Sequence, residues 1–335
     1  VADAFAVGEI GTPRTTDRIG FNIDLPVRTS NVYFDEERAL SVPWPKGPWP
    51  EVAASTFEPQ RWVDYQLNRD GTIQKYNEDV FLALIDKWLE GQNPLKDFTP
   101  VGLAKVLTGG LVRDVSPSIN WLNFQIVTPA GTTGPRGAIT PWEADYYIGL
   151  QLRGAEYAAR STEGASEWDV ACLGAAIFRR CGLPTRLVVG FDKTKPTEAD
   201  KRKQRDRQAA GLFDQKLKLR AWIEFYLYDE ANNTGNWVVC DPYRMRKSMG
   251  RPPPLSQKWK FFGTHDELAD VIPFSFHFAP PTDVKTYSSP GFWGLFVTPA
   301  APEYAYPAIG FTARKTAVPK DAPRDNLNKG NPFGR

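Results

Sequence analysis

The stretch from Glu163 to Arg186, EGASEWDVACLGAAIFRRCGLPTR, restricts the fold more than any other part of the chain. Its apolar residues recur with the period of a helix and form one buried stripe, made by Val170, Leu173, Ile177 and Phe178. Gly182 and Pro184 end this helix, and the run RLVVGF that follows predicts a central strand. A helix that leads into a strand in this way is typical of segments that carry a nucleophile at the helix start.

Further helices are predicted from periodicity and capping residues. NEDVFLALIDKWLEGQNP predicts a helix that begins after Asn77 and stops at Gly91. TPVGLAKVLTGGL predicts a shorter helix capped by Thr99. ITPWEADYYIGLQLRGAEYAA predicts a helix that begins at Thr140, with Glu143 completing a capping box.

Two strand-like segments, RAWIEFYLY and NWVVCDPYRM, are joined by DEANNTGN and together predict a β-hairpin. Before them, residues 192–216 are dense in both signs of charge. This stretch is either a solvated loop with a short exposed helix or a basic patch that docks a partner.

The composition excludes several classes of function. A formal net charge of +2 is too small for a nucleic-acid or membrane partner, so we expect neither. No window approaches the about 18 apolar residues of a membrane span, and no signal peptide is recognised, so we expect a soluble chain. The 3 cysteines and 2 histidines have no metal-ligand spacing, so we expect buried thiols, no metal and no cofactor.

Four blocks of sequence between about Ile139 and Met245 occur in the order found in a known family of hydrolases. They are TPWEADYYIGLQLRGAEY, DVACLGAAIFRRCGLPTRLVVGF, AWIEFYL and WVVCDP. In this order the chain resembles the transglutaminase-like branch of the papain-like cysteine hydrolases. The resemblance implies a nucleophile helix, a strand, a histidine strand and an aspartate strand.

The catalytic positions that the resemblance implies are only partly kept in this chain. Counted from the GLPTR turn, the family's cysteine falls on Glu167; counted from the preceding glycine, it falls on Ser166. The family's histidine falls on Arg220, and its aspartate matches Asp241. Arginine stays protonated in proteins and cannot act as a general base, so we expect no catalytic residues among these vestigial positions.

Three other kinds of residue are candidates to replace the missing nucleophile and base. Cys172 lies five residues beyond Glu167 on the helix, which turns it toward the core. Ser166 lies at the helix start, but a serine needs a base to activate it. His265 or His277 could fold back from the later segment to supply one, and the sequence leaves this open.

The substitutions also suggest a structural role for the vestigial site. Glu167, Arg220 and Asp241 would form a carboxylate–guanidinium–carboxylate clamp between helix and sheet, because the planar arginine fork suits two carboxylates. The alternative is that Glu167 points to solvent and acts only on the helix dipole.

We therefore expect an α+β fold, with helices packed on the antiparallel sheet of a transglutaminase-like core, a β-rich N-terminal region and an extended C-terminal arm. The expected division is a proline-rich, β or irregular region (1–75), a helical segment packing on the core (76–137), the transglutaminase-like core (138–250), an aromatic, turn-rich extension (251–315) and an extended or disordered tail (316–335).

Three functions are compatible with this reading. The first is a catalytically inactive structural or assembly component that contacts other protein subunits and could form a homo-oligomer, for instance in the neck, tail or baseplate of a phage virion. The second is a peptide or amide hydrolase or acyl-transferase with a non-standard site. The third is a peptide-binding module in which Trp168 and Trp222 border the old cleft. An intracellular location and a virion are equally compatible with the chain.

Overall fold

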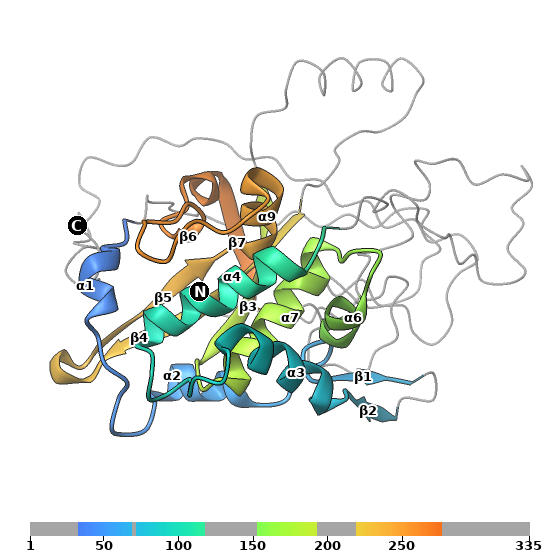
Figure 1. Ribbon diagram of the computed structural model, residues 1–335, viewed down its shortest axis with the longest axis horizontal. Coiled ribbons are helices and arrows are strands. Elements are labelled where there is room, and N and C mark those ends of the chain that lie inside the picture. Colours follow the sequence, from blue (N-terminus) through green and yellow to red (C-terminus); the bar gives the residue numbers. More distant parts are fainter. Residues whose placement is uncertain (1–32, 69–71, 118–152, 193–218, 277–335) are drawn as a thin grey trace, which may run out of the picture.

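The computed structural model describes residues 33–68, 72–117, 153–192 and 219–276, and the fold is built around one curled sheet (Figure 1). The sheet has 5 strands in the order β6-β5-β4-β3-β7. All neighbouring strands in it are antiparallel. The strands are β3 (Thr185–Asp192), β4 (Leu219–Asp229), β5 (Thr234–Cys240), β6 (Phe262–Gly263) and β7 (Val271–Ser275). Helices packed on an antiparallel sheet confirm the predicted α+β class.

Helix α7 (Glu167–Arg180) is the central helix of the core and packs on β3 and β4. It begins with a capping box: the Ser166 hydroxyl accepts from the Asp169 N–H, and the Asp169 carboxylate accepts from the Ser166 N–H. Gly174 lets the helix approach the sheet, since a Cβ there would lie 2.9 Å from the Ile223 side chain. Gly182 follows the helix with φ +86°, as its predicted role as a helix stop requires.

Helices α3 (Glu78–Leu89) and α4 (Pro100–Asp114) form the next layer, with α4 packed against α7 (Figure 1). Their predicted caps are confirmed, because the Asn77 side chain accepts from the Asp79 N–H and the Thr99 hydroxyl accepts from the Gly102 N–H. The prediction that the second helix is the shorter one is wrong, since α4 has 15 residues and α3 has 12. The short helix α6 (Ala155–Arg160) packs against both α3 and α7.

The N-terminal region contains less strand than predicted within residues 33–75. Its regular elements are α1 (Glu36–Leu40), α2 (Glu51–Ala54), η1 (Ser55–Phe57) and the hairpin of β1 (Tyr65–Leu67) with β2 (Ile73–Lys75). Buried Lys105 of α4 anchors this region, since its amine donates to Glu36 of α1 and to the carbonyl oxygens of Leu255 and Gln257. Segments from both ends of the described chain are therefore tied to α4.

The predicted hairpin of β4 and β5 is confirmed, but its second strand is shorter than predicted. The strand ends at Cys240, and the residues that follow form α9 (Pro242–Met249). Asp241 caps this helix and Pro242 occupies its first position, a combination that favours helix over strand. The chain then returns through β6, η3 (Asp266–Asp270) and β7, which supply both edges of the sheet.

Cys172, Cys181 and Cys240 are buried free thiols, as predicted. Within the described ranges, none of the helices has the length and apolarity needed to cross a bilayer. The first part of the helix predicted from Thr140, residues 193–216 of the charged stretch, His277 and the tail 316–335 lie outside the described residues. The last part of that predicted helix is described and is interrupted, because Gly154 has φ +93° and a new helix, α6, begins after it.

Candidate functional site

The candidate site lies where β4 begins and β5 ends, and Asp241 is at its centre. Asp241 is 2% exposed, and its Oδ1 accepts the Arg244 N–H at 2.9 Å as the cap of α9. Its Oδ2 accepts from Arg220 Nη2 at 2.8 Å and from His265 Nε2 at 3.1 Å. One carboxylate thus joins a strand, a helix start and the loop that follows β6.

Arg220 stands near the start of β4 and is buried. Its neighbour Ala221 faces the main core, so the alternation of a strand places Arg220 on the opposite face, beside buried Trp222. Arg220 Nη1 lies 3.7 Å from Glu267 Oε2, and the same oxygen accepts from Arg244 Nε at 2.7 Å. Arg220 is therefore shared between two carboxylates, Asp241 and Glu267.

Glu167 is the first residue of α7 and is partly exposed. Burial of its carboxyl and the negative charge of Asp241 raise its pKa to about 8, against the opposing effect of Arg220 and Arg244. No cation lies within ion-pair distance of this carboxyl among the described residues. Arg220 lies within ion-pair distance of Asp241 and Glu267, so in the described residues the second carboxylate of the expected clamp is Glu267 and not Glu167.

Ser166 is 4% exposed and lies at the start of α7. Its hydroxyl accepts the Asp169 N–H at 3.1 Å, so the side chain caps the helix. Ser166 lies at the start of α7, as the sequence predicts, and it is the N-cap of this helix.

His265 is the site residue that the sequence did not single out as part of the triad. Strand β6 pairs with the end of β5, Cys240 facing Phe262, and this return brings the imidazole beside Asp241. A carboxylate only accepts, so Nε2 carries the shared hydrogen unless Asp241 is protonated. Nδ1 is buried and has no hydrogen-bond partner among the described residues, while the ring packs edge-on against Phe261 at 4.7 Å. The only signal in the sequence was the presence of a histidine after the aspartate strand.

The tryptophans expected to border a peptide cleft contribute to packing. Trp222 is 3% exposed, and its Nε1 donates to Glu224 Oε1 at 3.1 Å. Trp168 is partly buried and packs against the main core. Neither arrangement favours an open peptide cleft.

The residues of the site do not suggest a resident metal. Among the described residues, no group of three histidine, cysteine or acidic side chains is placed to hold an ion. The donors to Asp241 are an arginine, an imidazole nitrogen and a backbone N–H, so its oxygens are already engaged.

Most residues of this site fall within a region that matches a known family. Residues 143–242 match the model of the transglutaminase-like superfamily. The match includes Ser166, Glu167, Arg220 and Asp241, whereas His265 lies beyond it. None of the curated proteins compared with the chain matches it.

Proposed function

Because residues 143–242 form a transglutaminase-like domain, we propose that this domain no longer catalyses acyl transfer and serves as a structural component of a larger protein assembly. The observation that carries the proposal is the 2.8 Å contact between Arg220 and Asp241. A permanently charged guanidinium occupies the position from which the family's imidazole would accept a proton.

The thiols of the described residues support the same proposal. A cysteine nucleophile must be partly exposed and must ionise near neutral pH. Burial raises the pKa of Cys172 well above its ordinary value, and that of Cys181 and Cys240 to about 12. Glu167, at the counted position of the nucleophile, has a carboxyl in place of sulfur.

The ion-pair network gives the vestigial site a structural role. Arg220, Asp241 and Glu267 connect β4, the start of α9 and η3. Breaking a buried pair by removing one partner typically costs about 3–5 kcal/mol, because the remaining charge is left buried and unpaired. We propose that the chain binds other protein subunits of this assembly. By analogy alone, we favour the neck, tail or baseplate of a phage virion.

Loss of catalysis is tested with the purified chain, a glutamine-bearing peptide plus an amine, and an activated ester. We expect no turnover above the buffer rate from the wild-type chain. The double variant Glu167→Cys, Arg220→His restores the residue types of the family and tests whether the substrates are suitable. Turnover by the wild-type chain that disappears in Asp241→Ala would overturn the proposal.

The assembly role is tested by fractionating native particles and measuring chain stoichiometry by quantitative mass spectrometry. A structural component has a fixed copy number relative to the other subunits of one particle. A chain found mainly free, or in varying ratio to every particle, would contradict this part of the proposal.

The contact between His265 and Asp241 favours a second candidate, a peptide or amide hydrolase or acyl-transferase of non-standard type. An imidazole oriented by an aspartate through Nε2 has Nδ1 available as a base, and Ser166 is the nucleophile at the helix start. In the described residues, however, neither ring nitrogen of His265 bonds to the Ser166 hydroxyl.

The same assays decide between the two candidates. If turnover is found, and both Ser166→Ala and His265→Ala abolish it while Arg220→Lys retains it, the hydrolase is correct. Turnover that survives both substitutions excludes this serine–histidine pair.

A further inference from the structure

The surface of the molecule has a pocket beyond the last residue of α7, at the end of this helix that is far from the Asp241 site. The pocket has a volume of about 370 Å³ and its described lining is apolar, formed by Trp44, Pro45, Gly47, Trp49, Phe57, Leu95 and Gly182. Helix α7 has 14 residues, so its two ends are about 20 Å apart. The pocket is therefore separate from the Asp241 site.

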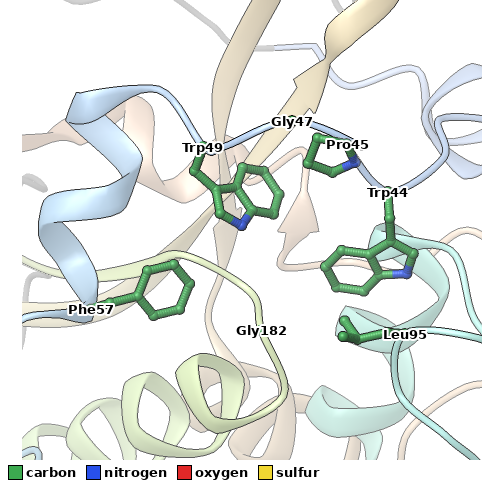
Figure 2. Close-up of a pocket in the computed structure, with 7 residues that line it drawn as sticks. All are labelled: Trp44, Pro45, Gly47, Trp49, Phe57, Leu95 and Gly182. Carbon is green, nitrogen blue, oxygen red and sulfur yellow. The ribbon is translucent and has the colours of Figure 1, made fainter.

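Two indole rings form the aromatic wall of this pocket. The centroids of Trp44 and Trp49 are 6.3 Å apart with the ring planes at 80°. In Figure 2 Phe57 lies on the left of the open space and Leu95 on the right, below Trp44. These two side chains are 39% and 53% exposed, which is high for apolar residues that face each other across a hollow.

The wall of the pocket is held in place before any ligand binds. The Glu230 carboxylate accepts the backbone N–H groups of Lys46 and Gly47, each at 2.8 Å. The Trp44 indole donates to the Phe98 carbonyl oxygen at 2.7 Å, which fixes the orientation of its ring. A preorganised aromatic surface loses little conformational entropy on binding.

The indole N–H of Trp44 donates a hydrogen bond within the described residues, whereas that of Trp49 does not. No described residue accepts a hydrogen bond from Trp49 Nε1, and its residue is partly exposed. In Figure 2 the nitrogen lies on the edge of the ring that faces Phe57 and Gly182, toward the open centre. A ligand carbonyl placed there would satisfy this donor.

An aromatic groove with a free indole donor fits one class of ligand well, a peptide in the polyproline II conformation. Such a peptide has no internal hydrogen bonds, so its carbonyl groups are available, and its proline rings pack on aromatic faces. This chain contains a suitable sequence, PAAPEYAYP, at residues 299–307. Pro299 and Pro302 are three residues apart, which places both rings on one side of a helix with three residues per turn.

We propose that the pocket formed by Trp44 and Trp49 binds the Pro299–Pro307 segment of the same copy of the chain. The segment lies outside the described residues and begins 23 positions after Phe276, the last of them (299 minus 276). A connection of that length reaches up to about 70 Å when extended, so the pocket is within range. Tethering keeps the segment at an effective concentration in the millimolar range, which favours the same copy over a neighbour.

The proposal is tested with a fluorescein-labelled peptide of residues 296–309 and the full chain, by fluorescence anisotropy. In the wild-type chain the tethered segment competes with the peptide. The variant Pro299→Ala, Pro302→Ala removes the competitor, and we expect it to bind the peptide about 10-fold or more tightly than the wild type does. A peptide carrying the same two substitutions should not bind.

Further variants locate the binding to the pocket. Trp49→Ala, added to Pro299→Ala, Pro302→Ala, should abolish peptide binding, and Trp49→Phe should weaken it because the ring remains while the donor is lost. Leu95→Ala serves as a second pocket variant, and Leu82→Ala, with a side chain 45% exposed on α3, is its matched control.

Three results would overturn the proposal. The first is equal peptide affinity of the wild-type chain and the variant Pro299→Ala, Pro302→Ala, which would mean that the segment does not occupy the pocket. The second is binding that Trp49→Ala and Leu95→Ala leave unchanged. The third is a concentration-dependent dimer that the two proline substitutions dissociate, which would assign the segment to a second copy.

Discussion

Asp169 and Asp241 are two buried aspartates, one in the first turn of α7 and the other immediately before α9. Asp169 accepts backbone N–H groups from Arg153, Gly154 and Ser166, at 2.6, 2.9 and 3.3 Å, and has a longer side-chain contact with Arg153 Nη2, at 3.5 Å. Asp241 accepts one backbone N–H, from Arg244, and takes its other hydrogen bonds from the side chains of Arg220 and His265.

The two aspartates differ in whether substitutions can change the groups that donate hydrogen bonds to them. Backbone donors are present whatever the sequence, so most of the hydrogen bonds to Asp169 do not depend on which side chains surround it. The side-chain donors to Asp241 can be exchanged by single substitutions. A histidine replaced by arginine in this way removes a general base but keeps a positive charge beside the carboxylate. Burial raises the pKa of Asp169, and its hydrogen bonds act in the opposite direction.

The largest effect is expected from Asp169→Ala. It removes the acceptor for three backbone N–H groups, and each buried unsatisfied donor costs about 1–3 kcal/mol, so we expect a loss of about 4 kcal/mol in the free energy of unfolding. Urea unfolding followed by circular dichroism measures this. Asp79→Ala, an exposed first-turn aspartate of α3, is the control and should cost less than about 1 kcal/mol. Equal losses in both variants would remove the distinction.

A smaller loss, about 3 kcal/mol, is expected from Asp241→Ala. The substitution leaves the Arg220 guanidinium buried, but Glu267 at 3.7 Å still offsets part of its charge. Removing both charges in Arg220→Met, Asp241→Leu should restore much of the stability, since no unpaired ion remains. The same urea titration measures the coupling, and additive losses would show that the pair does not interact.

A pH-dependent effect is expected from Glu167. Its pKa rises from an ordinary 4.5 to about 8 in the folded chain, so the folded state holds a proton that the unfolded state releases. The free energy of unfolding should therefore fall as pH rises from about 4.5 through about 8, and level off above. Glu167→Gln should remove this component of the slope in a series of urea midpoints. An unchanged slope would contradict the raised pKa.

The smallest effect is expected from Ser166→Ala, about 1 kcal/mol, the usual cost of losing a helix cap. The capping box would lose one of its two hydrogen bonds, while the Asp169 carboxylate would still accept the N–H of residue 166. Urea unfolding again gives the magnitude. A loss as large as that of Asp169→Ala would show that the serine does more than cap α7.

Local sequence patterns predicted the helices and strands. The candidate site depends on segments that are distant in the sequence and pack together in the fold. Asn77 and Thr99 are caps that a few neighbouring residues specify, so the starts of α3 and α4 could be predicted. Ser166 was predicted at the start of α7, but its capping role was not. The pairing of Arg220 with Asp241 followed from the order of strands in a known family. His265 and Glu267 could not be assigned, because their positions depend on how β6 and η3 pack after a turn that no periodicity specifies.

The pocket formed by Trp44 and Trp49 could not be predicted from the sequence either. Its lining comes from the proline-rich stretch of the N-terminal region, from η1, from Leu95 and from the turn after α7. No motif joins these residues, and only their packing makes a concave surface. The proline-rich sequence predicts a β or irregular region, but it does not specify the surface that these residues form.

The edges of the main sheet determine where the chain could be cut without loss of the fold. Strands β6 and β7 come from residues after 250, and α4, which covers α7, comes from residues before 118. A fragment with only residues 143–242 would leave β3 and β5 as open edges and strip one side of its central helix. Such a fragment should self-associate, and a fragment that avoids this should include α4, β6 and β7.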